Sequence, residues 1–376
     1  MQREIEPTLR FSKDLIRVPS TADNERGRLA VLDMATERLQ GFSSEEFQSN
    51  GVISRLFYNT PVLPDRFRII LNGHLDVVPA IHSEQYEPHE KEGKLFGRGA
   101  GDMKAAAAIQ IDVFRKIAHK LDYPIGLMLV TDEEVGGTNG TGQQVAQGVA
   151  TDFAIVGEPT NLGICHTMKG GIGLHVQTSS LAAHAAYPWR TKASTDEMMQ
   201  FAYNMREHFP TPDDTSWQTT AALTDLWTSQ QERTDEVTVS NTIPADTNST
   251  WDIRRVPQER EEVILSRVSE FAEANTSIAV VRTMPSAHTD PAHHDIVTLK
   301  NTIQAVTGQK ATTAIQHGSC DFRWFTQIGA GGVAYGPIAG DIHGSQEFVE
   351  IESLVQYSRV LEAYLLNINQ NQVRTR

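Results

Sequence analysis

The sequence predicts an α/β fold: a doubly wound, mainly parallel sheet into which a ferredoxin-like α+β domain is inserted. Three observations support this prediction. Helical and strand-like patterns alternate up to residue 167. From Met168 the order changes to β-α-β-β-α-β, as in a ferredoxin-like unit. The α/β alternation resumes after residue 284. We therefore expect one domain formed by residues 1–167 and 285–376, and a second domain over residues 168–284.

The first part of the larger domain is expected to alternate helices and buried strands. Apolar residues at helical spacing, or a helix-rich composition with basic residues near the end, predict helices over residues 7–20, 25–40 and 102–120. Continuous apolar runs, typical of strands covered on both faces, predict strands over residues 66–78, 125–130 and 152–158.

The inserted segment and the last part of the chain carry their own patterns. Alternating or β-branched runs predict strands over residues 170–180, 236–243, 247–256 and 277–284. Helical spacing predicts helices over residues 194–209 and 257–275, the second with Pro257 in its first turn. Two further helices are expected over residues 295–308, ending at Gly308, and over residues 351–368.

Composition excludes several classes of protein. The chain has 376 residues, which favours two domains, and a net charge of −14 that is spread along it. A basic nucleic-acid-binding face is therefore not expected. No run of eighteen apolar residues suggests a membrane span, and no signal-like segment is seen at the N-terminus. Cys165 and Cys320 form no CxxC pair, which fits a reducing cytoplasm.

Acidic and histidine side chains gather in four loops, three of which follow apolar strands. They are His74 and Asp76 in "LNGHLDVVP", Asp102 in "GRGAGDMK", Glu133 and Glu134 in "VTDEEVGG", and Glu158 in "AIVGEPT". Each loop alone is more typical of a solvated turn or strand end. The glycine-rich loop lacks the GxxxxGK[ST] pattern of a phosphate-binding loop. In a doubly wound sheet, however, loops at the C-terminal ends of parallel strands converge in one crevice.

Several carboxylates converging without basic partners would repel one another. Two divalent cations would reverse this repulsion. Imidazole and carboxylate suit zinc, with manganese or cobalt as alternatives. A second histidine is available late in the chain, as His343 in "AGDIHGSQEF". The sequence therefore predicts a site for two divalent metal ions, with Zn²⁺ as the first choice.

The ordered set of motifs resembles a known family of metallohydrolases. The motifs are "GHLDVVP", "LFGRGAGDMKAAAA", "TDEEVGG", "VGEPT", "AAHAAYPW", "SNTIPADTNSTWDIR", "GSCDFRWF" and "HGSQEFV". They are similar, in order and over nearly the whole chain, to those of acetylornithine deacetylase, succinyl-diaminopimelate desuccinylase, aminoacylase and glutamate carboxypeptidase. The resemblance implies a di-zinc catalytic domain over residues 1–167 and 285–376. It also implies a lid over residues 168–284 that in many members is the dimerisation domain.

The resemblance also implies roles for individual residues. Asp102 would bridge both metal ions, His74 and Glu158 would complete one site, and Glu134 and His343 the other. Glu133 would be the general base. Asp76 would hydrogen-bond His74 and fix its tautomer. Adjacent residues on an extended strand point to opposite sides, so Glu134 could bind metal while Glu133 stays unligated. Asp132 is expected only to support the turn.

The lid motifs imply further residues near the substrate. His184 would stabilise the oxyanion, coming from the other subunit in dimeric members, and Asn241 would lie near the substrate. Arg254 would bind the substrate carboxylate as a bidentate fork, with Arg255 as the competing candidate. Arg323, together with Asp321, matches a stretch beside the pocket. For these two residues, a structural salt bridge and a contact with the substrate are equally supported interpretations.

The sequence thus predicts a cytoplasmic zinc-dependent hydrolase of an amide bond, with an N-acyl amino acid or a short peptide with a free carboxylate as its substrate. Deacylation, as by acetylornithine deacetylase or the desuccinylase, is the first choice, and a dipeptidase or carboxypeptidase of the same family is the second. A metal-binding module without catalysis and a purely structural α/β protein are the alternatives from other classes. The expected partners are a small N-acyl amino acid or short peptide and a second copy of the chain, with no nucleic acid and no membrane.

Overall fold

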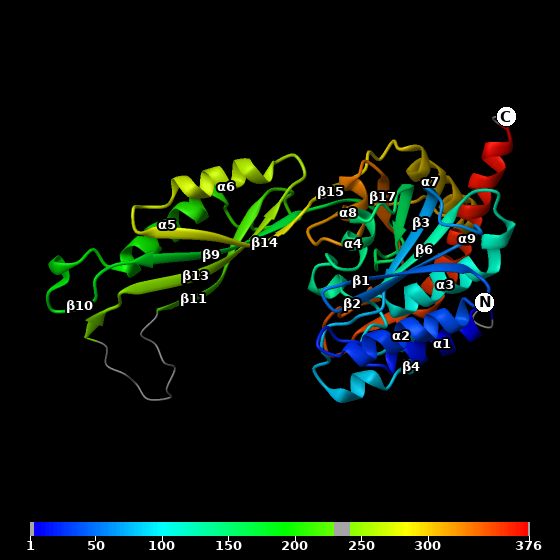
Figure 1. Cartoon of the computed structure of the whole chain (residues 1–376), viewed down its shortest axis with the longest axis horizontal. Coiled ribbons are helices and arrows are strands. Elements are labelled where there is room, and N and C mark those ends of the chain that lie inside the picture. The colour runs from blue at the N-terminus through cyan, green and yellow to red at the C-terminus, as the bar shows by residue number, and fades with distance from the viewer. Residues whose placement is uncertain (1–3, 229–240, 375–376) are drawn as a thin grey trace. The chain divides into compact units, whose positions relative to one another are not determined.

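The computed structural model describes residues 4–228 and 241–374, with side chains described up to residue 368. The chain forms two compact units. Unit 1 comprises Met1–Thr167, Ala287–Gln316 and Cys320–Arg376, and unit 2 comprises Met168–Ser286 with His317–Ser319. Figure 1 labels the elements of both units. Each unit is described by itself below.

A mixed sheet forms the centre of unit 1, in the order β1-β2-β6-β3-β7-β17-β8-β15, with β16 pairing with β8. Its strands are β1 (Ser43–Ser49), β2 (Val52–Tyr58), β3 (Phe67–His74), β6 (Ile125–Val130), β7 (Thr151–Val156), β8 (Ile164–Met168), β15 (Ala287–His288), β16 (Thr313–Gln316) and β17 (Gly331–Ala334). Strands β6, β3, β7 and β17 run parallel to their neighbours in this group. β2 is antiparallel to β1 and β6, and β8 is antiparallel to β17.

The expectation of a mainly parallel sheet was therefore wrong at its edges. The hairpin of β1 and β2 was not predicted, although Asn50 and Gly51 form its turn. Both residues have positive φ, at 46° and 76°. Asn-Gly with positive φ at both positions is the favoured two-residue hairpin turn. The polar, mostly exposed residues of β1 hid the strand, since they give no apolar alternation.

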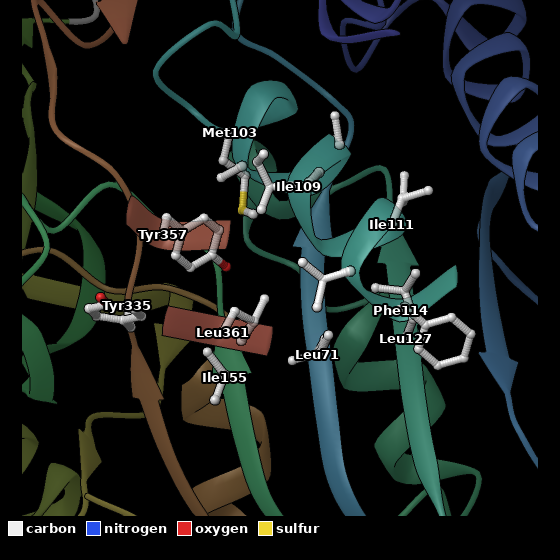
Figure 2. Packing of buried hydrophobic residues seen from close by; sticks show 14 of the residues in the cluster. Leu71, Met103, Ile109, Ile111, Phe114, Leu127, Ile155, Tyr335, Tyr357 and Leu361 are labelled. Atoms are coloured by element: carbon white, nitrogen blue, oxygen red, sulfur yellow. The ribbon is translucent and has the colours of Figure 1, made fainter. Parts of the chain in front are cut away.

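Helices cover both faces of this sheet, as a doubly wound fold requires. On β3, Ile69 and Leu71 belong to one apolar cluster and Ile70 to another. The larger cluster draws on α1 (Glu6–Ile16), α2 (Glu25–Arg38), α3 (Lys104–Ile117), α7 (His294–Thr307) and α9 (Ile351–Arg374). The smaller cluster draws on α4 (Thr141–Ala146) and α8 (Phe322–Gln327). Figure 2 shows Leu71, Leu127 and Ile155 of the sheet beneath side chains of α3 and α9.

A small second sheet of unit 1, in the order β18-β19-β5-β4, joins two distant segments. Its strands are β4 (His89–Lys91), β5 (Lys94–Phe96), β18 (Ala339–Gly340) and β19 (Phe348–Glu350). β5 pairs with β19, so that Phe96 lies opposite Phe348. The loop that follows β5 is therefore held beside the loop between β18 and β19. Short 3₁₀ turns lie between these elements: η2 (Ser83–Tyr86), η3 (Ala118–Lys120) and η4 (Glu133–Val135) in unit 1, and η5 (Pro188–Arg190) in unit 2.

Unit 2 is an antiparallel sheet with two helices. Its elements follow the order β9 (Gly170–Ser179), α5 (Ser194–His208), β11 (Thr220–Thr228), β13 (Asp246–Arg255), α6 (Glu261–Glu270) and β14 (Thr276–Met284). The strands lie in the order β11-β13-β9-β14, and every pairing is antiparallel. Leu174, Phe201, Trp251 and Val268 are among the residues of its own apolar core.

One strand of unit 2 was predicted at the wrong place. In chain order, the second strand of the four-stranded sheet is β11. Its side chains are mostly exposed or half-buried, so its sequence shows no clear alternation of apolar and polar residues. Residues 236–240 of the predicted strand lie outside the described residues. Its end, β12 (Thr242–Ile243), pairs instead with β10 (Ala183–His184). Within the described residues no helix is both long and apolar enough to cross a membrane.

Candidate metal centre

His74 is the last residue of β3, and its buried ring is held from both sides. Its Nδ1 lies 3.1 Å from the main-chain oxygen of Asp76, and 3.6 Å from the Asp76 carboxylate. A carbonyl can only accept, so Nδ1 carries a proton, and Nε2 is the ring nitrogen that faces the carboxylates. Nε2 lies 2.9 Å from Asp102 Oδ1 and 3.6 Å from Glu158 Oε1. Asp76 is therefore the partner of His74, as predicted, but the shorter contact is made by its main-chain oxygen and not by its carboxylate.

Asp102 lies between two groups of possible ligands. It stands in the glycine-rich loop between β5 and α3. His74, Asp102 and Glu158 form one group, and Asp102, Glu134 and His343 form the other, each with ligand atoms within 4.8 Å of one another. His343 Nε2 lies 3.1 Å from Glu134 Oε2 and 3.6 Å from Asp102 Oδ2. All five side chains predicted to bind metal are therefore brought together in unit 1.

Glu133 lies beside these groups and belongs to neither. Its Oε1 is 3.6 Å from Nη1 of Arg323. Glu133 and Glu134 stand in the 3₁₀ turn η4, and not on an extended strand as the sequence argument assumed. Successive side chains in such a turn point about 120° apart. The two carboxylates therefore still separate, although strand alternation is the wrong reason.

The carboxylates of Asp76 and Asp132 hold the backbone around η4. Asp76 accepts hydrogen bonds from the backbone N–H of Glu133 at 3.3 Å and of Glu134 at 3.0 Å. Asp132 Oδ2 accepts from the backbone N–H of Asn139 and Gly140. Asp132 therefore supports the turn, as expected. Asp76 connects the loop after β3 to the turn after β6, a role that the sequence did not indicate.

Burial and mutual repulsion raise the pKa values of two acidic side chains of the site, Glu158 and Glu133. Burial, and then the charge of Asp102, raise the pKa of Glu158 well above its ordinary value. Burial, and then the charge of Asp321, raise the pKa of Glu133 to about 8. Burial opposes ionisation of Asp102 as well, but hydrogen bonds from His343 and His74 outweigh it and lower its pKa.

The pKa values of the two histidines are raised by their acidic neighbours. Burial disfavours the charged form of His74, but contacts with Asp102 and Asp76 raise its pKa well above the ordinary value. Hydrogen bonds to Asp102 and Glu134 raise the pKa of His343 to about 10. Clustered carboxylates thus draw protons onto the imidazoles. Divalent cations replace such protons and need these same donor atoms, so the donor set fits two metal ions.

A buried ion pair that the sequence analysis did not single out lies next to the centre. Arg98 Nη1 is 2.5 Å from Glu347 Oε2, and both side chains are 1% exposed. Both residues stand within quoted motifs, "GRGAGDMK" and "HGSQEF". Charged side chains in glycine-rich loops are usually solvated, so only the structure reveals their burial.

Arg323 is buried in unit 1, with a side chain that is 1% exposed. Its Nη2 donates to the main-chain oxygen of Gly136 at 2.7 Å and lies 3.6 Å from Asp321 Oδ1. These contacts, with that to Glu133, match the structural alternative considered for this residue. They anchor the turn that carries Glu133.

Two predicted substrate-side residues, His184 and Asn241, lie together in unit 2. His184 of β10 is opposite Thr242 of β12, and the main-chain oxygen of Asn241 accepts from the backbone N–H of Ala185 at 2.7 Å. Both side chains are exposed. His184 Nδ1 accepts from the backbone N–H of Ala186, which leaves Nε2 as the outer ring nitrogen.

Arg254 and Arg255 both have partners within unit 2. Arg254 forms a bidentate pair with Asp252, at 2.6 and 3.1 Å. Arg255 donates to the main-chain oxygen of Glu259 and to Ser286 Oγ. The side chain of Arg254 remains 34% exposed, so part of its guanidinium is accessible.

Comparisons with known proteins agree with these features. The sequence profile of peptidase family M20/M25/M40 matches residues 70–367. Succinyl-diaminopimelate desuccinylase of Janthinobacterium sp. (strain Marseille) is 26% identical over 391 residues, covering 96% of this chain and 99% of the relative. The protein of the same name from Thiobacillus denitrificans (strain ATCC 25259 / T1) is 27% identical over 394 residues, covering 95% and 94%.

Solved structures share the fold. Aminopeptidase PepT from Bacillus cereus ATCC 10987 superposes with a TM-score of 0.77 at 16% identity, covering 96% of this chain and 97% of that one. Human carnosine dipeptidase 1 gives a TM-score of 0.68 at 15% identity, covering 98% and 97%.

Proposed function

The chain belongs to peptidase family M20/M25/M40 and is a hydrolase of amide or peptide bonds, and from that premise we propose that it removes the acyl group from an N-acyl amino acid. The relatives described as succinyl-diaminopimelate desuccinylases support this substrate class. The observation that carries the proposal is the pair of ligand groups sharing Asp102, with Glu133 beside them and outside both.

In this proposal two divalent cations, zinc by first choice and cobalt or manganese as alternatives, occupy the two groups. His74 and Glu158 would hold one, Glu134 and His343 would hold the other, and Asp102 belongs to both groups. Bound there, the cations would polarise the scissile carbonyl and make water a stronger acid. Asp76 keeps the ring of His74 oriented through the hydrogen bond at Nδ1.

Glu133 is the general base of the proposed reaction. It takes a proton from the attacking water, whose oxygen forms a bond to the acyl carbon. When the carbon–nitrogen bond breaks, Glu133 delivers that proton to the leaving amine. The products are a carboxylate and a free amino acid. Its place beside both ligand groups and outside each of them supports this role, because an unligated carboxylate can accept a proton and return it.

Unit 2 is proposed to act as the lid and as the surface for a homodimer, as the family resemblance implies. His184 donates to the developing oxyanion, Asn241 lies near the substrate, and Arg254 or Arg255 binds the substrate carboxylate. The exposed Nε2 of His184 supports its part. Two free cysteines, Cys165 and Cys320, support a cytoplasmic location, because a reducing compartment keeps thiols unpaired.

The test is release of free amine by purified protein loaded with zinc or cobalt. The panel contains N-acetyl and N-succinyl amino acids and unblocked dipeptides, and bound metal is counted by elemental analysis. Turnover of acyl amino acids with two metal ions bound is the expected result. Turnover of dipeptides alone would favour the dipeptidase alternative. Two bound metal ions without any turnover would make the chain a metal-binding module.

A further inference from the structure

We propose that Arg98 and Glu347 are positioning residues that hold Asp102 and His343 against each other, and that they thereby set the affinity of the His343 cation site. This inference rests on the proposed metal centre. Within the described residues, the hydrogen bonds of both side chains go to each other and to backbone atoms, and not to the side chains of the proposed metal ligands. Both act on the backbone of the two residues that carry those ligands.

Glu347 fixes the loop that presents Asp102. Its Oε1 accepts three backbone N–H groups, from Gly99 at 2.9 Å, Gly101 at 3.0 Å and Asp102 itself at 3.1 Å. Three such bonds on one oxygen leave the loop a single arrangement. A carboxylate suits this position, because its second oxygen, Oε2, can accept from Arg98 at the same time.

Arg98 fixes the loop that presents His343. Its Nη1 pairs with Glu347, while its Nη2 donates to the main-chain oxygen of His343 at 3.1 Å and of Gly344 at 3.3 Å. The planar guanidinium therefore spans the two loops with fixed geometry. Gln85 assists, since its Nε2 also donates to the oxygen of Gly344 at 2.9 Å.

The two loops approach closely at Gly101, where an added side chain would require its neighbours to shift. A Cβ there would lie 2.7 Å from Ile342 Cδ1 and 3.1 Å from the main-chain oxygen of Phe348. This contact lies beside both Asp102 and His343. The Arg98–Glu347 pair therefore lies at the contact between the two loops, which is the place that determines the distance between Asp102 and His343.

The two halves of the centre depend on this pair to different degrees. His74 ends β3, is buried, and gains its position from strand pairing. His343 lies in a loop, has a positive φ of 62°, and its side chain is 49% exposed. Its backbone is held by the bond from Arg98. Weakening the pair should therefore loosen the His343 site and spare the His74 site.

The experiment is a titration of the metal-free full chain with Co²⁺, followed by visible absorption, which yields one Kd for each site. Wild type is compared with Arg98→Lys, Glu347→Gln and the double variant. Lysine keeps the charge and loses the fork. His343→Ala identifies which Kd belongs to the His343 site. Arg68→Lys is the matched control, since Arg68 forms a buried pair with Asp295 elsewhere in unit 1.

In Arg98→Lys the Kd of the His343 site should rise by about 10- to 100-fold, the range for residues that orient metal ligands, while the other Kd stays unchanged. The double variant should add little to the single ones, because both remove one shared contact. Arg68→Lys should leave both Kd values unchanged. Thermal unfolding of each metal-free variant reports its stability separately.

Equal weakening of both sites, or no weakening, in a folded Arg98→Lys protein would overturn the inference and leave the proposed function standing. If wild type binds fewer than two cobalt ions, the proposed centre itself is wrong, and the inference falls with it.

Discussion

Glu133 and Glu134 are neighbours in the chain with different surroundings. Glu134 lies 3.1 Å from His343 Nε2, whereas Glu133 lies 3.6 Å from the guanidinium of Arg323. The separation comes from the 3₁₀ turn, whose backbone is held by the carboxylate of Asp76. At the scale of single residues, the site thus gives two chemically identical groups different surroundings, as the proposed division into a metal ligand and a general base requires.

Replacing Glu133 by alanine should abolish turnover and leave the metal content near normal. The reason is its place outside both ligand groups. The measurements are kcat on the best acyl amino acid and elemental analysis of the same sample. Glu134→Ala serves as the comparison and should lose one metal ion. Loss of both ions in Glu133→Ala would show that the assignment is wrong.

Replacing His184 by alanine should lower kcat by about two to three orders of magnitude, as for the loss of an oxyanion donor. Its side chain is exposed and makes no buried contact, so stability should hardly change. Steady-state kinetics with wild type and His208→Ala, an exposed histidine at the end of α5, provide the comparison. An unchanged kcat would make His184 an ordinary surface residue.

At the scale of elements, β3 connects the core to the site. Its middle residues are buried on both faces, and its last residue is His74. Near its start, Arg68 forms a bidentate pair with Asp295 of α7, at 2.6 and 3.2 Å. Tyr364 Oη donates to the same carboxylate at 3.1 Å. The strand is thus tied to α7 and α9 at one end and presents a ligand at the other.

Replacing Arg68 by alanine should lower the free energy of unfolding by about 3–5 kcal/mol, because the Asp295 carboxylate, 4% exposed, would remain buried without its cation. Urea unfolding followed by circular dichroism measures the loss. Arg17→Ala removes an exposed pair with Asp14 and should cost no more than about 1 kcal/mol. Equal losses in the two variants would contradict the argument from burial.

The elements that the sequence predicted well are those with strong patterns. β6 and β7 are continuous apolar runs, and α3 and α9 have long amphipathic or helix-rich sequences. β1 and β11 were missed because their exposed residues show no alternation. The five ligands could be predicted to converge, since four of them follow strands or a glycine turn. The roles of Arg98 and Glu347 could not, since their burial depends on the pairing of β5 with β19.

At the scale of the whole molecule, two separate apolar cores exist. The core of unit 2 is one cluster that includes Trp251 and Phe201, and the core of unit 1 consists of two clusters of described residues that lie on the two faces of its large sheet. All five proposed ligand residues belong to unit 1. The two units should therefore unfold in separate steps, and only one step should respond to metal.

Removing metal with a chelator should lower the unfolding temperature of unit 1 and leave that of unit 2 unchanged. At a free cation concentration about 100 times Kd, binding to one site stabilises the folded unit by about 2.7 kcal/mol. Scanning calorimetry with and without EDTA measures both transitions. Trp251→Ala, which opens the core of unit 2, identifies the other transition. A common shift of both would show that the units unfold together.

The interruption of unit 1 has a consequence for how the protein is made. Unit 2 is almost continuous in sequence, so a ribosome has released nearly all of it before α7 is complete. Chains fold during synthesis from the N-terminus, domain by domain. The residues before Met168, by contrast, must wait for β17, His343 and α9 to complete their sheet, their ligand set and their core. The proposed ligand set therefore stays incomplete until the segment that carries His343 has been made, so catalysis is not expected from a chain in which unit 2 alone has folded.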